Sequence, residues 1–212
     1  VESIEDATVK RHLYTLASDE MEGRMTGTPG IEKAAQYIEG EFARIGLKTY
    51  DNLTDYRQRF TFKNRRTQED IEAFNVIGVL EGKSKKDEYV VVSGHYDHIG
   101  IRKVEGQLDS IYNGADDDAS GTTAVMALAE YFAKKKNNER TIIFVAFTAE
   151  EMGLVGSKHF GKDVDASKFV AGINIEMIGK DSEFGPKTAW LTGFERSNFG
   201  KIIQKNLEGT GY

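Results

Sequence analysis

The sequence lacks several features that would point to common functional classes. Its 212 residues contain no cysteine, which excludes disulfide bonds, cysteine-based zinc sites and thiol catalysis. No apolar run approaches the ~18 residues that a membrane-spanning helix needs. The net charge is −6, because acidic residues outnumber basic ones. We therefore expect neither nucleic acid nor an anionic membrane as a partner. Any metal must therefore be held by histidine, aspartate or glutamate.

The length and composition fit a single globular domain. The 212 residues suffice for one sizeable α/β domain with its own hydrophobic core. A hydrophobic content of 39% and a charged content of 29% are typical of such domains. The chain opens at Val1 without the basic and apolar segments of a targeting peptide, as a processed export product or a trimmed chain would. We expect one domain over residues 1–212.

The spacing of apolar residues predicts helices and strands that alternate along the chain. Helical periodicity extends over about residues 4–18, 28–45, 117–136, 154–160 and 199–207. Short β-branched or alternating runs predict strands at about 56–63, 74–80, 89–93, 141–147, 169–175 and 189–191. This alternation implies an α/β fold with helices on both faces of a mostly parallel, mixed sheet, in which the half-exposed strand at 56–63 is antiparallel.

Acidic residues and a histidine lie where the predicted strands end or the next helix begins. In open parallel sheets, ligands bind beyond the carboxyl ends of the strands. Carboxylate and imidazole groups together are typical ligands of zinc. A helix cap would explain one aspartate of the run Asp116–Asp118, but not three in succession. The candidate site residues are His95, Asp97, Asp117, Glu150, Glu151 and Glu176.

Four segments that contain these residues share their pattern with a known family. They read Ser-Gly-His-Tyr-Asp-His at 93–98, Gly-Ala-Asp-Asp-Asp-Ala-Ser-Gly at 114–121, Glu-Glu-Met-Gly-Leu-Val-Gly-Ser at 150–157 and Asn-Ile-Glu-Met-Ile-Gly at 174–179. With them the sequence resembles the di-zinc exopeptidases, which include the bacterial secreted (leucyl-type) aminopeptidases and plasma glutamate carboxypeptidase. The resemblance covers about residues 10–180 in unbroken order.

The resemblance implies a zinc aminopeptidase-like fold and a zinc-dependent exopeptidase that acts on peptides, in particular an aminopeptidase. It implies two zinc ions per complete active site. Asp117 would bridge the two ions, and His95 and Glu176 would complete the protein ligands of one of them. Glu151 would bind the other ion.

The same resemblance assigns roles to the remaining candidates. Glu150 would be the general base, and Asp97 would orient the imidazole of His95. A cis peptide bond would follow Asp117. The protein would act in the periplasm or outside the cell. The family's last zinc ligand, a histidine, would come after residue 212, so we expect a C-terminally incomplete domain that is poor in metal and inactive.

Two other functions are compatible with the same fold. A glutaminyl-cyclase-like acyltransferase would use a single zinc ion, against which the bridging aspartate argues. A non-catalytic recognition domain would have lost its metals, against which the pair Glu150 and Glu151 argues. Two further histidines are interpreted structurally: His12 as a surface residue, and His98 as a loop residue or a neighbour of the metal ligands.

Overall fold

The computed structural model describes residues 4–106, 108–162 and 164–210. It divides into two compact units, residues 1–177 and 178–212. The first unit contains a sheet of six strands. They are β1 Lys48–Thr49, β2 Arg57–Lys63, β3 Asp70–Leu80, β4 Lys85–His95, β5 Arg140–Phe147 and β6 Phe169–Asn174. That residues 1–212 form one catalytic domain stays a prediction.

The sheet is mixed. Its strands follow the order β1-β3-β5-β4-β6, and β2 pairs with β3 as well. β4 runs parallel to β5 and β6, whereas β3 runs antiparallel to β1, β2 and β5. Every antiparallel pair of the sheet therefore includes β3, and both pairs that include β4 are parallel. The parallel part is the one that ends in the candidate site residues.

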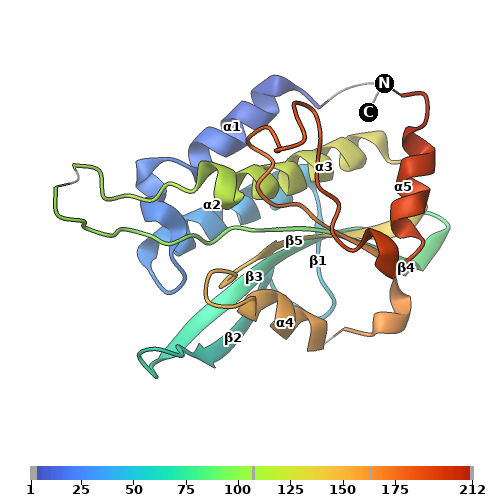
Figure 1. Ribbon diagram of the computed structural model, residues 1–212. Helices are drawn as coiled ribbons and strands as arrows, with labels where there is room; N and C mark the ends of the chain where they lie inside the picture. Colours follow the sequence, from blue (N-terminus) through green and yellow to red (C-terminus); the bar gives the residue numbers. More distant parts are fainter. Residues whose placement is uncertain (1–3, 107, 163, 211–212) are drawn as a thin grey trace. The chain divides into compact units, whose positions relative to one another are not determined.

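Helices cover both faces of the sheet (Figure 1). On one face, α2 contacts β3 and α3 contacts β4 and β5, and α1 packs on α3; α4 contacts β2 and β3 on the other face. This confirms the predicted α/β class with its mixed sheet. The helices of this unit are α1 Asp6–Leu16, α2 Pro29–Ile45, α3 Gly121–Lys135 and α4 Val155–Lys162.

Alternation along the central strands divides the core into two layers. Val76, Val92 and Phe144 pack against α1, α2 and α3 in one cluster. Their neighbours Ile77 and Val91 belong to the cluster on the opposite face. Because successive strand residues point to opposite faces, strands that are apolar on both sides must be covered on both sides. The continuous apolar runs of β4 and β5 therefore require the helices on each face.

The structure corrects some predicted boundaries. The helix expected from residue 117 begins at Gly121, after a wide turn over Ala115–Ser120 in which Asp117 and Asp118 have non-helical backbone angles. Aspartate side chains that bond nearby backbone groups compete with helix formation, and Asp118 accepts from the Gly121 amide. The peptide bond between Asp117 and Asp118 is cis, as the resemblance implied. Residues 189–191, an expected strand, form no strand among the described residues.

The second unit is described over residues 178–210. It contains a short 3₁₀ turn, Phe194–Arg196, and helix α5, Phe199–Leu207. The rings of Phe184 and Trp190 contact each other with their centroids 5.2 Å apart. Searching all described residues finds no helix with the length and apolar character to cross a membrane.

His12 is fully buried, contrary to its predicted surface position. Its Nδ1 lies 2.8 Å from the hydroxyl of Tyr37, and its Nε2 lies 3.4 Å from the Nη2 atom of Arg11. Arg11 can only donate, so Nε2 accepts and Nδ1–H donates to Tyr37, which is the neutral form of imidazole. Burial, together with the positive charge of Arg11, lowers the pKa of His12 to about 4.

This buried histidine makes the fold sensitive to acid. The unfolded chain takes up a proton on His12 near its ordinary pKa of 6.5, but the folded chain does so only near pH 4, so stability falls as the pH drops through that window. Between pH 7 and pH 5 the wild type should lose about 2 kcal/mol more unfolding free energy than His12→Gln, measured by urea denaturation. His159→Gln is the control for losing one histidine. Equal losses in His12→Gln and wild type would refute this account.

Candidate metal centre

The fold brings the candidate residues to one edge of the sheet. His95 is the last residue of β4, and Glu150 closely follows β5. Because β4 is parallel to β5 and β6, the carboxyl ends of these strands are neighbours. Glu176 follows β6, and Asp117 lies in the turn before α3. This is the edge at which open α/β sheets bind ligands.

His95 is the buried centre of the group. Its Nδ1 lies 3.1 Å from the backbone carbonyl oxygen of Asp97. Its Nε2 lies 3.1 Å from Oδ1 of Asp117 and 4.0 Å from Oε2 of Glu150. Nε2 is nevertheless a buried atom with no hydrogen-bond partner in the part of the chain that the structure describes. With Nδ1–H donating to the Asp97 carbonyl, the Nε2 lone pair points at carboxylates, which is the arrangement of a histidine that binds a metal.

The electric field at His95 favours positive charge. Burial alone would lower the pKa of this imidazole, but Asp97, Asp118 and Glu150 outweigh burial and raise the pKa to about 9. A field that stabilises an imidazolium in this position also stabilises a metal cation beside it. The arrangement of possible ligand atoms and the electric field around them therefore both favour a bound cation.

Two sets of potential ligand atoms share Asp117. One set consists of His95, Asp117 and Glu176, the other of His98, Asp117 and Glu151, and within each set the atoms lie within 4.8 Å of one another. Two ligands at ~2.1 Å from a tetrahedral zinc ion are ~3.4 Å apart, so the ligand atoms of each set would move together by up to about 1.4 Å to hold one ion. Oδ1 of Asp117 faces His95, whereas Oδ2 lies 4.0 Å from Nδ1 of His98. The two carboxylate oxygens are therefore directed to different sets.

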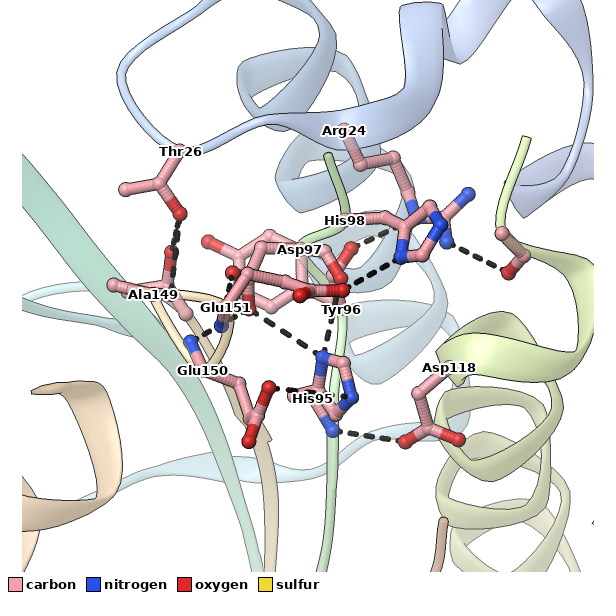
Figure 2. A network of polar contacts seen from close by, with 12 residues as sticks. Arg24, Thr26, His95, Tyr96, Asp97, His98, Asp118, Ala149, Glu150 and Glu151 are labelled. Carbon is pink, nitrogen blue, oxygen red and sulfur yellow. Dashed lines mark hydrogen bonds and ion pairs between the residues drawn. The ribbon is translucent and has the colours of Figure 1, made fainter. Parts of the chain in front are cut away.

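His98 was not among the candidate ligands predicted from the sequence. Its Nδ1 lies 2.8 Å from Oε1 of Glu151, and Figure 2 shows the two side chains directed toward each other. Its ring packs against Gly114, where an added Cβ would lie 2.6 Å from the ring. The signal in the sequence was its position one residue after Asp97, just beyond the end of a strand.

Asp97 links two of the segments that carry the site. Its carboxylate is buried and accepts hydrogen bonds from the backbone amides of Glu150 and Glu151, at 3.1 and 3.3 Å. The carboxylate oxygen Oδ1 is 3.6 Å from Nδ1 of His95, farther than the backbone carbonyl of the same residue. Asp97 thus contacts His95 through its main chain and the loop after β5 through its side chain, as Figure 2 shows.

Glu150 lies beside the donor sets without belonging to either. Burial raises the pKa of its carboxyl group, and the negative charges of Asp97, Glu176 and Glu151 raise it further, while His95 opposes them. A carboxylate with a raised pKa at the rim of a site is suited to accept a proton during catalysis.

A third cluster of acids and histidine is a charge network rather than a metal site. His12, Glu41 and Glu130 lie close enough to share an ion. However, Arg44 contacts Glu41 at 2.8 Å and Glu130 at 2.7 Å, and Arg11 contacts Glu41 at 2.8 Å. The guanidinium groups already neutralise both carboxylates, so a metal ion would have to displace them.

Arg24 is a fully buried guanidinium near the candidate site (Figure 2). It donates to carbonyl oxygens at the end of α1, just after β4, and in the loop that leads into the turn of Asp117. Its acceptors are the carbonyls of Leu16, Tyr96, Asn113 and Gly114. Burial lowers the pKa of Arg24 to about 10, which leaves it charged at neutral pH.

Removing this guanidinium should strongly destabilise the protein. Arg24→Met would leave four carbonyls without their donor, and we expect a loss of at least ~3 kcal/mol in the free energy of unfolding, measured by chemical denaturation. Arg102→Met, at an exposed position, is the matched control and should change stability by less than ~0.5 kcal/mol. A loss below ~1 kcal/mol for Arg24→Met would show that water replaces the guanidinium.

Comparison with known sequences assigns these segments to a known group. Residues 75–205 match the sequence profile of peptidase family M28. A "Probable zinc metalloprotease" from Pyrenophora teres f. teres is 30% identical over 155 residues, which are 71% of this chain and 33% of that protein. Aminopeptidase YwaD from Bacillus subtilis is 28% identical over 149 residues, 66% of this chain and 29% of that protein. The chain thus spans about a third of the length of these relatives.

Solved structures share the fold. A glutaminyl cyclase from Porphyromonas gingivalis superposes with a TM-score of 0.78 at 18% identity, over 99% of this chain and 73% of that chain. A leucine aminopeptidase precursor from Bacteroides thetaiotaomicron superposes with a TM-score of 0.73 at 19% identity, over 98% of this chain and 72% of that chain. At such identities the likeness shows the fold alone.

Proposed function

The chain belongs to peptidase family M28, and on this premise we propose that it is a zinc-dependent exopeptidase, in particular an aminopeptidase, that hydrolyses the terminal peptide bond of a peptide. The observation that carries the proposal is the buried Nε2 of His95, which has no hydrogen-bond partner among the described residues and faces the carboxylate of Asp117. The names of the relatives, a zinc metalloprotease and an aminopeptidase, support the same activity.

We assign two zinc ions to the two donor sets that share Asp117. His95 and Glu176 complete the first set, and His98 and Glu151 complete the second. Each set then offers three protein ligands, the number typical of catalytic zinc, and leaves a position for water or substrate. The assignment departs from the expectation of a metal-poor chain, because that expectation gave the second ion only Asp117 and Glu151.

The protein's own residues supply the proton transfers. When bound, zinc polarises the peptide carbonyl and makes water a better nucleophile at neutral pH. Glu150 takes the proton of the attacking water and gives it to the amine that leaves. Its position 4.0 Å from Nε2 of His95 leaves its carboxylate free of the donor sets, and its raised pKa suits a group that must hold this proton between the two steps.

Asp97 positions the base and the first ligand together. Its carboxylate holds the amides of Glu150 and Glu151, and its carbonyl oxygen accepts from Nδ1 of His95. That bond fixes the tautomer in which Nε2 is free to bind a cation. A periplasmic or extracellular location, and a single catalytic domain over residues 1–212, belong to the same proposal and rest on the family resemblance.

A glutaminyl-cyclase-like acyltransferase with one zinc ion is the second candidate, because the fold is shared with such enzymes. The donor set formed by His98, Asp117 and Glu151 favours two ions and therefore the peptidase. Assays of the same sample separate the two: an aminoacyl arylamide reports hydrolysis, and a peptide with N-terminal glutamine reports cyclisation.

Glu150→Gln should abolish turnover while it preserves metal binding. The amide keeps the size of the side chain but cannot take up a proton, so hydrolysis of an aminoacyl arylamide should fall ~10²–10⁴-fold. Zinc content, measured on the same samples, should stay at the wild-type value. Glu139→Gln, an exposed glutamate, is the control and should keep full activity. Near-normal turnover in Glu150→Gln would assign the base to another residue.

The second donor set predicts the zinc stoichiometry. The wild-type chain, equilibrated with zinc and freed of excess, should hold two ions by elemental analysis, whereas His98→Ala should hold one tightly. His159→Ala removes a histidine from α4, away from both donor sets, and should hold two. If His98→Ala also retains two tightly bound ions, the role of His98 is limited to its hydrogen bond with Glu151.

A further inference from the structure

We propose that Asp118 is the positioning residue of the metal centre, whose carboxylate sets the spacing of the three segments that carry His95, Asp117 and Glu176. This inference rests on the proposed zinc site and adds to it a residue that is not itself a ligand. Asp118 is fully buried, and Figure 2 shows its carboxylate beside the main chain of His95.

The carboxylate of Asp118 accepts three backbone hydrogen bonds from three different segments. Oδ2 accepts from the amide of His95 at 3.1 Å. Oδ1 accepts from the amides of Gly121 at 2.9 Å and Met177 at 3.1 Å. Both oxygens are therefore engaged by the main chain, which occupies three of the roughly four lone-pair sites of the carboxylate.

Two of the three bonds lie at or next to a proposed zinc ligand: the amide of His95 belongs to a ligand, and Met177 directly follows Glu176. Asp118 itself directly follows the third ligand, Asp117. A displacement of the carboxylate would therefore shift all three ligands of the first donor set relative to one another. The bond to Gly121 fixes the carboxylate to the first residue of α3, a rigid element.

Two glycines provide the space for this carboxylate. A Cβ on Gly121 would lie 2.5 Å from both oxygens of Asp118 and 2.1 Å from the carbonyl oxygen of Ile175. A Cβ on Gly94 would lie 3.1 Å from Oδ2 and 3.1 Å from the same carbonyl. The chain thus passes closely around the carboxylate on two sides, so the side chain has no room to move away from its three donors.

A carboxylate is the only side chain of this size that satisfies three amide donors. It carries two acceptor oxygens and no donor, whereas asparagine has one acceptor oxygen and an amino group that would oppose one of the N–H groups. Asp118→Asn is nearly equal in shape, so it tests the hydrogen bonds rather than the packing. Removal of the residues that orient metal ligands typically costs ~10–100-fold in metal affinity.

The test compares zinc affinity in variants of the 212-residue chain by competition with a chromophoric chelator. Asp118→Asn should bind the first zinc at least ~10-fold more weakly than wild type. In the cobalt-substituted protein, its d–d absorption spectrum should also change. Asp116→Asn removes the same charge two residues away and should stay within ~3-fold of wild type. Gly94→Ala, which crowds the carboxylate without altering it, should weaken zinc binding in the same direction, and it serves as the test if Asp118→Asn does not fold.

The outcomes separate this inference from the proposed function. If the wild type binds no zinc, the proposed function fails and this inference fails with it. If the wild type binds zinc and Asp118→Asn binds it equally well with an unchanged cobalt spectrum, the positioning role alone is wrong. Equal weakening in Asp118→Asn and Asp116→Asn would reduce the effect to general electrostatics and would also overturn the role.

Discussion

Repulsion among carboxylates is the constraint on which the rest of this structure depends. Asp117, Glu150, Glu151 and Glu176 converge on the edge of the sheet around the imidazoles of His95 and His98, and each would be more stable apart from the others in water. Burial raises the pKa of Glu150 and the neighbouring acids raise it further, whereas at His95 burial lowers the pKa and the acids outweigh that effect. Negative potential is therefore concentrated around the imidazoles, and a cation bound there would relieve it.

The scaffold can hold these groups together because the main chain is fixed independently of them. β4 lies between β5 and β6 with parallel pairing on both sides: the ladder with β5 extends to His95, and the ladder with β6 extends to Ser93. Asp97 then ties the loop after β5 to the end of β4 through the amides of Glu150 and Glu151. The stability of the whole sheet, rather than any single contact, thereby offsets the repulsion among the crowded acids.

The sequence predicted the parts of the structure that follow from local patterns. Helix α2 begins at Pro29 and ends before Gly46, whose φ of +84° is the left-handed conformation that terminates helices, and both signals are readable in the chain. The sequence also predicted that the candidate residues after these strands would lie close together, because the carboxyl ends of parallel strands share one edge of the sheet. The beginnings of β3 and β4 were missed, since the hydrophobic runs mark only the more buried residues that follow them. The burial of His12 and the contact of His98 with Glu151 depend on tertiary packing and leave no periodic signal.

Two buried side chains of opposite charge, Arg24 and Asp118, hold the irregular backbone around the site. Loops that approach a metal centre cannot satisfy their peptide groups within helices or strands, and an unpaired buried peptide group is costly. Arg24, which has only donors, satisfies carbonyl groups, whereas Asp118, which has only acceptors, satisfies amides. Burial lowers the pKa of Arg24, and the negative charges of Asp97, Asp118 and Asp117 oppose that shift. Because a neutral side chain of either size would offer both donors and acceptors, or neither, the charges here fix the backbone geometry, and the proposed ligands take their positions from that backbone.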